Sequence, residues 1–258
     1  RAGFGPSDVD RQRWQGKRLA AAVNWLLATP VTPIGTPPVN GAARLDPTAN
    51  DTDLVLEWLD RMVRADNPLP ERMTFFWHRH FATSRADVTP AMIFRQIGLF
   101  RRFSDLAANP AANFRDLVQQ VTTDPAMLRS LTGELNVRGR PNENYGRELA
   151  ELFCLGATNA AGQPNYSEDD VKELARALSG WRINTTDPAN PVSYFTESRW
   201  DTGNKTILGK VGAFNSAQAV DVVLAHPSHA PYLMRKLWSE FVQSPPDDAT
   251  INDLARTY

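Results

Sequence analysis

Apolar residues return every three or four positions in segment after segment of this chain. The segment that starts near residue 71 shows the pattern most plainly, with apolar positions at i, i+3, i+4, i+7 and i+8: Met73, Phe76, Trp77, His80 and Phe81. This spacing places the side chains on one face of an α-helix, which can bury that face against other helices. Because the same period recurs through most of the 258 residues, the sequence predicts an all-α or strongly α-dominated, multi-helix fold.

A single region has the composition and turn signals expected of paired strands. Residues 192–200 and 205–208 are separated by Asp-Thr-Gly-Asn at 201–204, a sequence rich in turn-forming residues. The two runs flanking this turn predict one small β-hairpin near 192–208.

The domain organisation follows from the segments that interrupt the helical pattern. A proline-rich loop is expected over 29–50, because prolines lack a backbone donor and favour extended conformations. A hairpin and loop insertion is expected over 182–215. No internal repeat divides the rest, so residues 1–258 are predicted to form a single helical domain.

Capping residues locate several helix ends. Ser167 and Asp170 have the spacing of a capping box, and Asp124 before Pro125 combines an N-cap with a proline at the first helical position. Gly156 is expected to end a helix that begins near residue 142. Further helices are predicted at 7–15 (from a Ser7–Asp10 capping box), 17–28, 51–64, 92–103, 114–122, 217–225 and 229–242. In the 51–64 helix the predicted apolar face comprises Leu54, Trp58, Leu59 and Met62, and the place of Val55 is left open.

Composition excludes several classes of function. Lys and Arg total 28 against 29 Asp and Glu, a net charge of -1, so no basic excess favours nucleic acid. No apolar run reaches the roughly 20 residues that cross a bilayer. Cys154 is the only cysteine, which excludes an internal disulfide and a cysteine-rich zinc site. Residues 205–212 lack P-loop spacing, and Lys236 is expected to be solvated.

Several motifs occur in an order that resembles one protein family. They are RAGFGP at 1–6, FWHRHFATS at 76–84, NFRDL at 113–117, DPAML at 124–128, PNENYGRELAELF at 141–153, KTILG at 205–209 and RKLW at 235–238. Together they resemble the bacterial domain of unknown function 1800 (DUF1800) family over essentially the whole chain. Two positions depart from the family pattern: Gly146 stands where alanine is usual, and Trp200 stands where histidine is common.

The resemblance carries implications of its own. It implies an uncharacterised bacterial protein whose relatives are longer, so that this chain is a fragment truncated at both ends. It also implies a protein partner from a neighbouring exported family. The compartment is left open; export is one alternative, and its signal would lie upstream of this fragment. Neither nucleic acid nor a membrane span is expected.

Two histidines in the second motif are candidates for chemistry. His78 and His80 lie about 200° apart on a helix, so both cannot face one metal ion unless the helix is broken. His80 lies on the apolar stripe beside Trp77. A buried histidine that hydrogen-bonds a carbonyl or a carboxylate is the more common role at such a position, and a ligand or general base is the functional alternative.

The helix predicted at 142–156 supplies the acidic candidates. Glu148 and Glu151 belong to a polar stripe beside the apolar face, and Glu143, Arg147 and Glu151 are spaced for a ladder of ion pairs. The predicted apolar face comprises Tyr145, Leu149, Leu152, Phe153 and Gly156. A surface helix with ion pairs is the simplest interpretation. Glu148 is the exception, because a carboxylate at the core boundary is costly unless it is paired.

These residues lead to two hypotheses of function. In the first, the protein is a metal-assisted or acid/base enzyme in which His80 or His78 meets Glu148 and Glu151 on an adjacent helix. Glu148, His80 and His78 are then the catalytic candidates, and with Glu151 they could hold a divalent metal. In the second, the chain is a non-enzymatic structural or interaction module of an exported protein.

Overall fold

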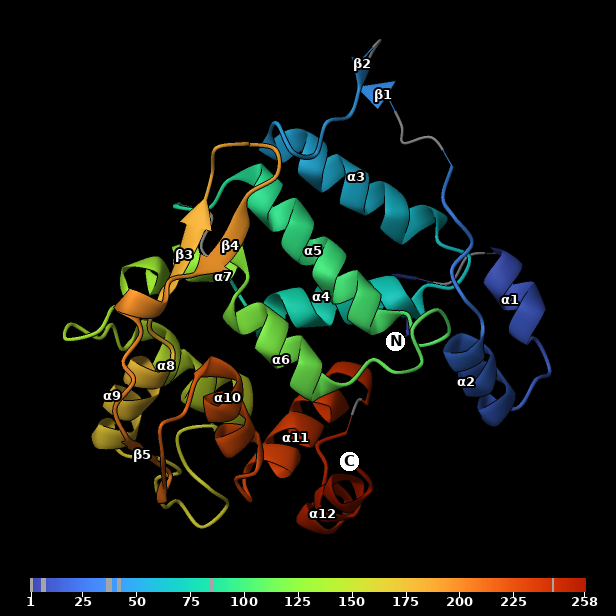
Figure 1. Ribbon diagram of the computed structural model, residues 1–258. Coiled ribbons are helices and arrows are strands. Elements are labelled where there is room, and N and C mark those ends of the chain that lie inside the picture. The colour runs from blue at the N-terminus through green and yellow to red at the C-terminus, as the bar shows by residue number, and fades with distance from the viewer. Residues whose placement is uncertain (1, 6–7, 36–38, 41–42, 84–85, 243) are drawn as a thin grey trace. The chain divides into compact units, whose positions relative to one another are not determined.

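The structure is a computed structural model that describes residues 2–5, 8–35, 39–40, 43–83, 86–242 and 244–258 (Figure 1). The described residues are dominated by helices, joined by three two-stranded antiparallel sheets. This confirms the α-dominated fold class. No described helix is both long enough and apolar enough to cross a membrane.

The chain divides into two compact units, which are described separately. Unit 1 comprises residues 1–82 and 89–117, and unit 2 comprises residues 83–88 and 118–258. The helix α6 (Phe114–Thr122) begins in unit 1 and ends in unit 2. A single domain over the whole chain stays a prediction.

Unit 1 is built mainly from helices, some of which begin at a capping side chain. Its elements are α1 (Asp8–Trp14), α2 (Leu19–Ala28), the short strands β1 (Val39–Asn40) and β2 (Ala43–Arg44), α3 (Asp51–Arg64), α4 (Leu69–His80) and α5 (Pro90–Ser104). The Asn50 side chain accepts from the Asp53 amide at the start of α3, and Thr89 caps α5 ahead of Pro90. The predicted Ser7 cap lies outside the described residues.

The core of unit 1 lies between α4 and α5. Of the predicted stripe, Met73 is half-buried and the other four residues are buried. The Phe81 ring stacks on Phe100, with centroids 5.9 Å apart, and on Phe114, at 6.1 Å. Burial of aromatic rings in such offset contacts is a major contribution to core stability. The periodicity therefore identified the buried face of this helix correctly.

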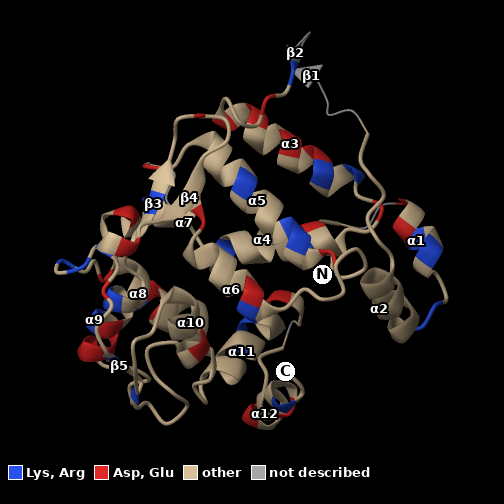
Figure 2. Cartoon of the chain, in the orientation of Figure 1, with Lys and Arg blue, Asp and Glu red and all other residues tan. Residues whose placement is uncertain are grey.

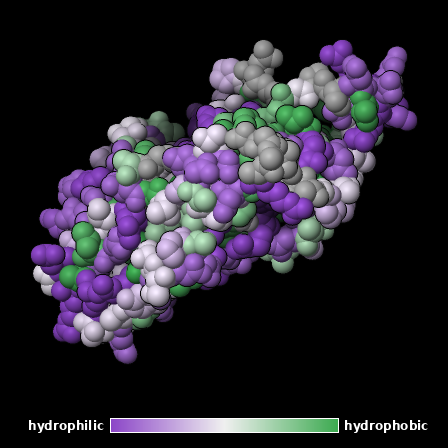
Figure 3. Space-filling view, turned by 90° about the horizontal axis from the view of Figure 1, so that it is seen from above, coloured by the Kyte–Doolittle hydropathy of each residue, from purple (hydrophilic) through white to green (hydrophobic). Residues whose placement is uncertain are grey.

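The predicted apolar face of α3 is only partly right. Leu54 is buried, but Val55 and Leu59 are 48% and 50% exposed, whereas Glu57 is 4% exposed. The helix is turned so that the Trp58 indole donates to Glu71 on α4, at 3.0 Å. Sequence periodicity does not reveal this polar contact between α3 and α4. The space-filling view shows green apolar areas among the hydrophilic surface (Figure 3).

Unit 2 holds the helices that carry the acidic candidates. Its elements are α7 (Pro125–Ser130), η1 (Gly133–Leu135), α8 (Asn144–Glu148), η2 (Leu149–Leu155), α9 (Glu168–Ala177), β3 (Trp181–Asn184), β4 (Val192–Phe195), η3 (Glu197–Arg199), β5 (Lys205–Ile207), β6 (Lys210–Gly212), α10 (Ser216–Leu224), α11 (His229–Phe241) and α12 (Asp248–Thr257). The predicted caps are confirmed: Asp124 accepts from the amides of Ala126 and Met127, and Ser167 and Asp170 form a complete capping box.

The predicted strand pairing is wrong in its partners. Residues 192–195 pair with 181–184 to form β3–β4, and residues 205–207 pair with 210–212 to form β5–β6. Leu208 and Gly209 have φ values of 48° and 76°, so both central residues of the β5–β6 turn are left-handed. Such a turn suits a two-residue hairpin. Because of this turn, β5 pairs with β6, which follows it directly in the chain. The 3₁₀ turn η3 lies between β4 and β5.

Candidate active site

The helix with the acidic candidates changes its winding partway along. The sequence predicts one α-helix from 142 to 155, but α8 ends at Glu148 and η2 continues as a π-helix. The Gly156 amide donates to the carbonyl of Glu151, five residues earlier, at 3.0 Å. π-Helical turns are rare and often occur at functional sites, because the wider turn re-aims the side chains.

The wider turn changes which residues face the core. Phe153, Cys154 and Leu155 are buried in succession, while Leu152 is 47% exposed. Leu152 was predicted to belong to the apolar face, and that prediction is wrong because the face assumed a regular period of 3.6 residues. The predicted C-terminal glycine is confirmed: Gly156 follows η2 with a φ of 77°.

Two donors from α11 bind the carbonyl of Leu152. The Tyr232 hydroxyl and the Lys236 ammonium each donate to this oxygen at 2.8 Å. Lys236 was expected to be solvated, but burial lowers the pKa of its side chain. Burial also raises the pKa of Tyr232 to about 12. A cation and a hydroxyl thus cap the end of the π-helix, where backbone carbonyls lack helical partners.

The two glutamates of this helix have different surroundings. The Tyr166 hydroxyl donates to the Glu151 carboxylate. Glu148 is half-buried, and none of the described residues donates a hydrogen bond to it. Burial raises the pKa of Glu148, the neighbouring Glu151 raises it further, and Arg147 partly opposes them. An added proton is therefore favoured on Glu148.

Arg147 is not free to neutralise Glu148. Its guanidinium forms two hydrogen bonds of 2.7 Å with Glu168 and lies 3.5 Å from Glu143. The first step of the predicted ladder, Glu143 with Arg147, is therefore confirmed. Glu151 instead bonds to Tyr166, a partner that lies outside the helix and that the helical spacing could not indicate.

The histidines lie in the aromatic core of unit 1. His80 is 6% exposed and stacks on the ring of Phe76, with centroids 5.8 Å apart. The His78 ring meets the edge of Trp58 at 5.1 Å, and its Nδ1 is buried without a hydrogen-bond partner among the described residues. Burial lowers the pKa of His78. Both histidines thus belong to α4, and both rings lie among aromatic side chains.

The predicted site therefore divides between the two units. Glu148 and Glu151 come together on one helix of unit 2, whereas His78 and His80 belong to unit 1. The pairing of a histidine with Glu148 stays a prediction, as does a metal held by these four residues. Across the described parts of the chain, no three His, Cys, Asp or Glu side chains form a group suited to a metal ion.

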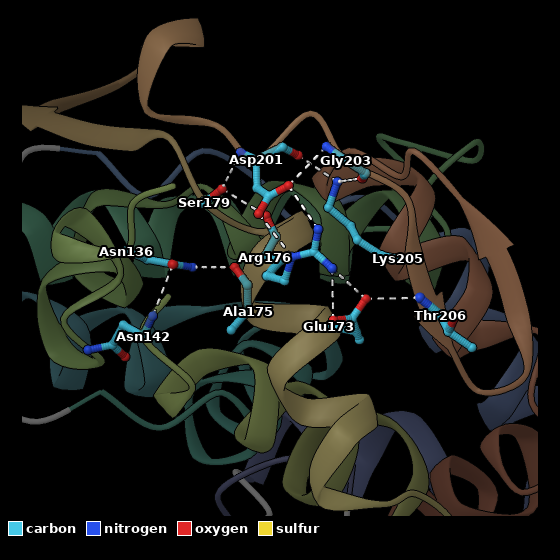
Figure 4. Close-up of polar contacts among 10 residues, drawn as sticks. All are labelled: Asn136, Asn142, Glu173, Ala175, Arg176, Ser179, Asp201, Gly203, Lys205 and Thr206. Carbon is cyan, nitrogen blue, oxygen red and sulfur yellow. Dashed lines mark hydrogen bonds and ion pairs between the residues drawn. The ribbon is translucent and has the colours of Figure 1, made fainter. Parts of the chain in front are cut away.

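A second polar cluster of unit 2 includes residues of the motif segments 141–153 and 205–209 (Figure 4). The Arg176 guanidinium donates to both carboxylate oxygens of Asp201, at 2.9 and 3.1 Å, and to Glu173 at 2.8 Å. Lys205 is only 1% exposed, and its ammonium donates to the carbonyls of Asp201 and Gly203 at 2.6 and 2.9 Å.

The same cluster ties the 201–206 segment to α9. Ser179 accepts from the Asp201 amide at 2.9 Å, and the Thr206 amide donates to Glu173 at 3.0 Å. The Lys205 ammonium also lies over the Trp200 ring, 5.1 Å from its centroid. With its donors directed to backbone carbonyls and an aromatic face, Lys205 holds a loop in place.

The family assignment follows from a match over the full chain. The family described as "Protein of unknown function (DUF1800)" matches residues 1–258. The chain belongs to the DUF1800 family. In this DUF1800 protein, the segment 141–153 contains α8 and most of η2, and the segment 205–209 forms β5 and the turn that follows it. No curated protein and no solved structure gave a significant match.

Proposed function

We propose that this DUF1800 protein is an acid/base enzyme in which Glu148 exchanges a proton with the substrate. The observation that carries the proposal is the contrast between neighbouring carboxylates. Glu143, Glu151 and Glu168 each have a partner, whereas Glu148 is half-buried and receives no hydrogen bond from the described residues. A carboxyl in such surroundings is costly for stability, so a role in chemistry accounts for its position.

The pair of glutamates suits acid/base chemistry for a further reason. Glu151 is held by Tyr166, and its negative charge raises the pKa of Glu148. A carboxyl whose pKa is raised by a second carboxyl beside it can act as a proton donor. A raised pKa also brings a general acid closer to neutral pH, where proton transfer is most efficient.

The histidines complete the proposal in its more specific form. His80 or His78 would then supply the second titratable group, alone or together with a divalent metal bound by Glu148 and Glu151. This form predicts a bound metal in the purified full-length protein that is lost in Glu148→Gln and in His80→Phe, a change that keeps the aromatic stacking. Metal content is measured by elemental analysis. A protein without metal overturns the metal-assisted form and leaves acid/base catalysis by Glu148 to be tested separately.

The acid/base proposal is tested on the full-length protein in two ways. Side-chain carboxyl signals are followed by NMR as a function of pH, with Glu148→Gln used for assignment. Hydrolysis is measured on chromogenic esters, glycosides and phosphate esters, with Glu143→Gln as the matched control on the same helix. We expect a raised pKa for Glu148 and turnover lost only in Glu148→Gln. An ordinary pKa together with turnover that does not depend on Glu148 overturns the proposal.

The alternative function is a non-enzymatic structural or interaction module, and export of the protein stays a prediction of the family resemblance. The two hypotheses predict different phenotypes for a Glu148→Gln allele in the native host. If the protein is an enzyme, replacing the gene by the Glu148→Gln allele gives the phenotype of a deletion although the protein is folded and present. If it is an interaction module, that allele behaves like the wild type.

A further inference from the structure

Four arginines of unit 2 have no acidic partner among the described residues. Arg138 and Arg140 lie in the loop between η1 and α8, Arg182 lies on β3, and Arg199 ends η3. We call this group the arginine surface. The other described arginines of unit 2 each form an ion pair with a carboxylate: Arg129, Arg147, Arg176, Arg235 and Arg256.

Backbone hydrogen bonds bring the four arginines together. The Arg138 amide donates to the carbonyl of Arg199 at 2.7 Å, and the Gly180 amide, two residues before Arg182, donates to the carbonyl of Asn136 at 3.1 Å. Within the loop, the amide of Arg140 donates to Val137 at 3.0 Å. In Figure 2 the basic residues accordingly colour this loop, at the left of the view, and the strand β3 beside it. The three separate segments that carry the four arginines are thus held next to one another in unit 2.

The arginine surface also has a donor that lacks an acceptor. Arg138 and Arg140 are exposed, but Arg199 is half-buried, and its Nε is buried without an acceptor in the described part of the chain. A buried donor on a charged group costs free energy when it is left unpaired. Glu197 and Asp201 each lie two residues from Arg199 in sequence. Within the described residues Glu197 forms no ion pair with it, and Asp201 pairs with Arg176 instead.

Exposed apolar side chains accompany the four charges. Tyr194, the cross-strand partner of Arg182, is 44% exposed, and Leu135 at the end of η1 is 56% exposed. Arginine and aromatic side chains are enriched in protein–protein interfaces. A guanidinium binds a carboxylate through two parallel hydrogen bonds. The surface therefore combines carboxylate binding with apolar contacts.

We propose that the arginine surface binds an acidic segment of a partner protein in which carboxylates are interspersed with apolar residues. A nucleic acid is a poorer match, because it requires positive charge along an extended track and the chain has a net charge of -1. The proposal does not depend on Glu148, so failure of one leaves the other intact.

The test is fluorescence anisotropy with the full-length protein. The probe is a fluorescein-labelled peptide that alternates Glu with Leu, compared with the same peptide carrying Lys in place of Glu and with oligothymidylate. We expect the acidic peptide to bind and to weaken with added salt. Arg138→Glu/Arg140→Glu should reduce its affinity at least about tenfold, since two charge-assisted contacts become repulsive.

The matched control is Lys172→Glu/Lys210→Glu, which makes the same change in charge at exposed lysines of unit 2. It should alter the affinity by less than about twofold if only net charge is affected. Circular dichroism verifies that each variant is folded. The proposal is overturned if the acidic peptide binds no better than the basic one, or if both double variants bind it equally. It is also overturned if oligothymidylate binds more tightly than the peptide, which would identify a nucleic-acid site.

Discussion

Replacing Lys205 by methionine is expected to destabilise the protein by about 2–4 kcal/mol. Lys205 is almost completely buried, and its ammonium donates to the carbonyls of Asp201 and Gly203. Methionine has a similar length but no donor, so the packing is kept while two buried carbonyls lose their partner. Hydrogen bonds to a charged group contribute about 1.5–3 kcal/mol each, giving about 3–6 kcal/mol for two. Part of this is regained because the variant no longer buries a charge.

The loss is measured by urea unfolding of the full-length protein and by its melting temperature. A change of about 2–4 kcal/mol corresponds to a decrease of roughly 5–15 °C for a domain of this size. Lys210→Met is the control: Lys210 lies on the paired strand β6 and is exposed, so its replacement should change stability by less than about 0.5 kcal/mol. If Lys205→Met is also within about 0.5 kcal/mol of the wild type, the reasoning from buried carbonyls is refuted.

The effect of Lys205 should also depend on pH in a defined direction. Burial lowers the pKa of Lys205, and attraction by Asp201 offsets part of that effect. The unfolded chain therefore keeps this proton to a higher pH than the folded chain does. Wild-type stability, relative to Lys205→Met, should then rise as the pH increases from the lowered folded value towards the ordinary value of 10.5. A neutral amine still has two donors for the two carbonyls, so the contacts survive the titration.

Three further predictions concern the glutamate helix. Because the pKa of Glu148 is raised in the folded protein, the wild type loses stability as the pH rises from 4.5 through the folded pKa. The free energy of unfolding of Glu148→Gln, measured with urea, should therefore equal that of the wild type near pH 4. At neutral pH it should be higher than that of the wild type by less than about 1 kcal/mol. A stabilisation that shrinks as the pH rises would contradict this sign. Gly146→Ala should destabilise the protein by about 1 kcal/mol in the same assay, although alanine has the better helix propensity. The reason is that the new Cβ would lie 3.2 Å from the carbonyl oxygen of Val171. A gain in stability would show that α9 can move to make room. Tyr232→Phe removes one of two donors to the Leu152 carbonyl and should cost about 1 kcal/mol, measured by thermal melting, and a neutral result would mean that Lys236 alone suffices.

Local sequence signals predicted the features of the fold that depend on a few adjacent residues. Ser167 with Asp170 and Asp124 with Pro125 begin helices where expected, because a cap satisfies amides only two or three residues away. Most of the stripe that ends at Phe81 is buried for a similar reason, since its spacing places it on one face of the helix. Such features require no knowledge of distant parts of the chain.

Features that depend on distant partners could not be predicted in this way. The spacing of apolar residues over 149–155 is compatible with an α-helix, and the π-helix ends in contacts with Tyr232 and Lys236, about eighty positions later. The β5–β6 turn was missed because a leucine with positive φ, Leu208, gives no turn signal. In the candidate site, Glu148 was correctly placed at the core boundary, but Tyr166 as the partner of Glu151 was not foreseen.

The supports of the glutamate helix distinguish Glu148 from the residues around it. Gly146 has no side chain, and this lets α8 approach the backbone of α9 closely. At the other end, α11 caps the carbonyl of Leu152. The helix is therefore held on both sides by contacts that do not involve Glu148, and Glu151 and Arg147 are bonded to other residues. Glu148 accepts no hydrogen bond within the described residues and its burial raises its pKa, which is the arrangement that the proposed acid/base role requires.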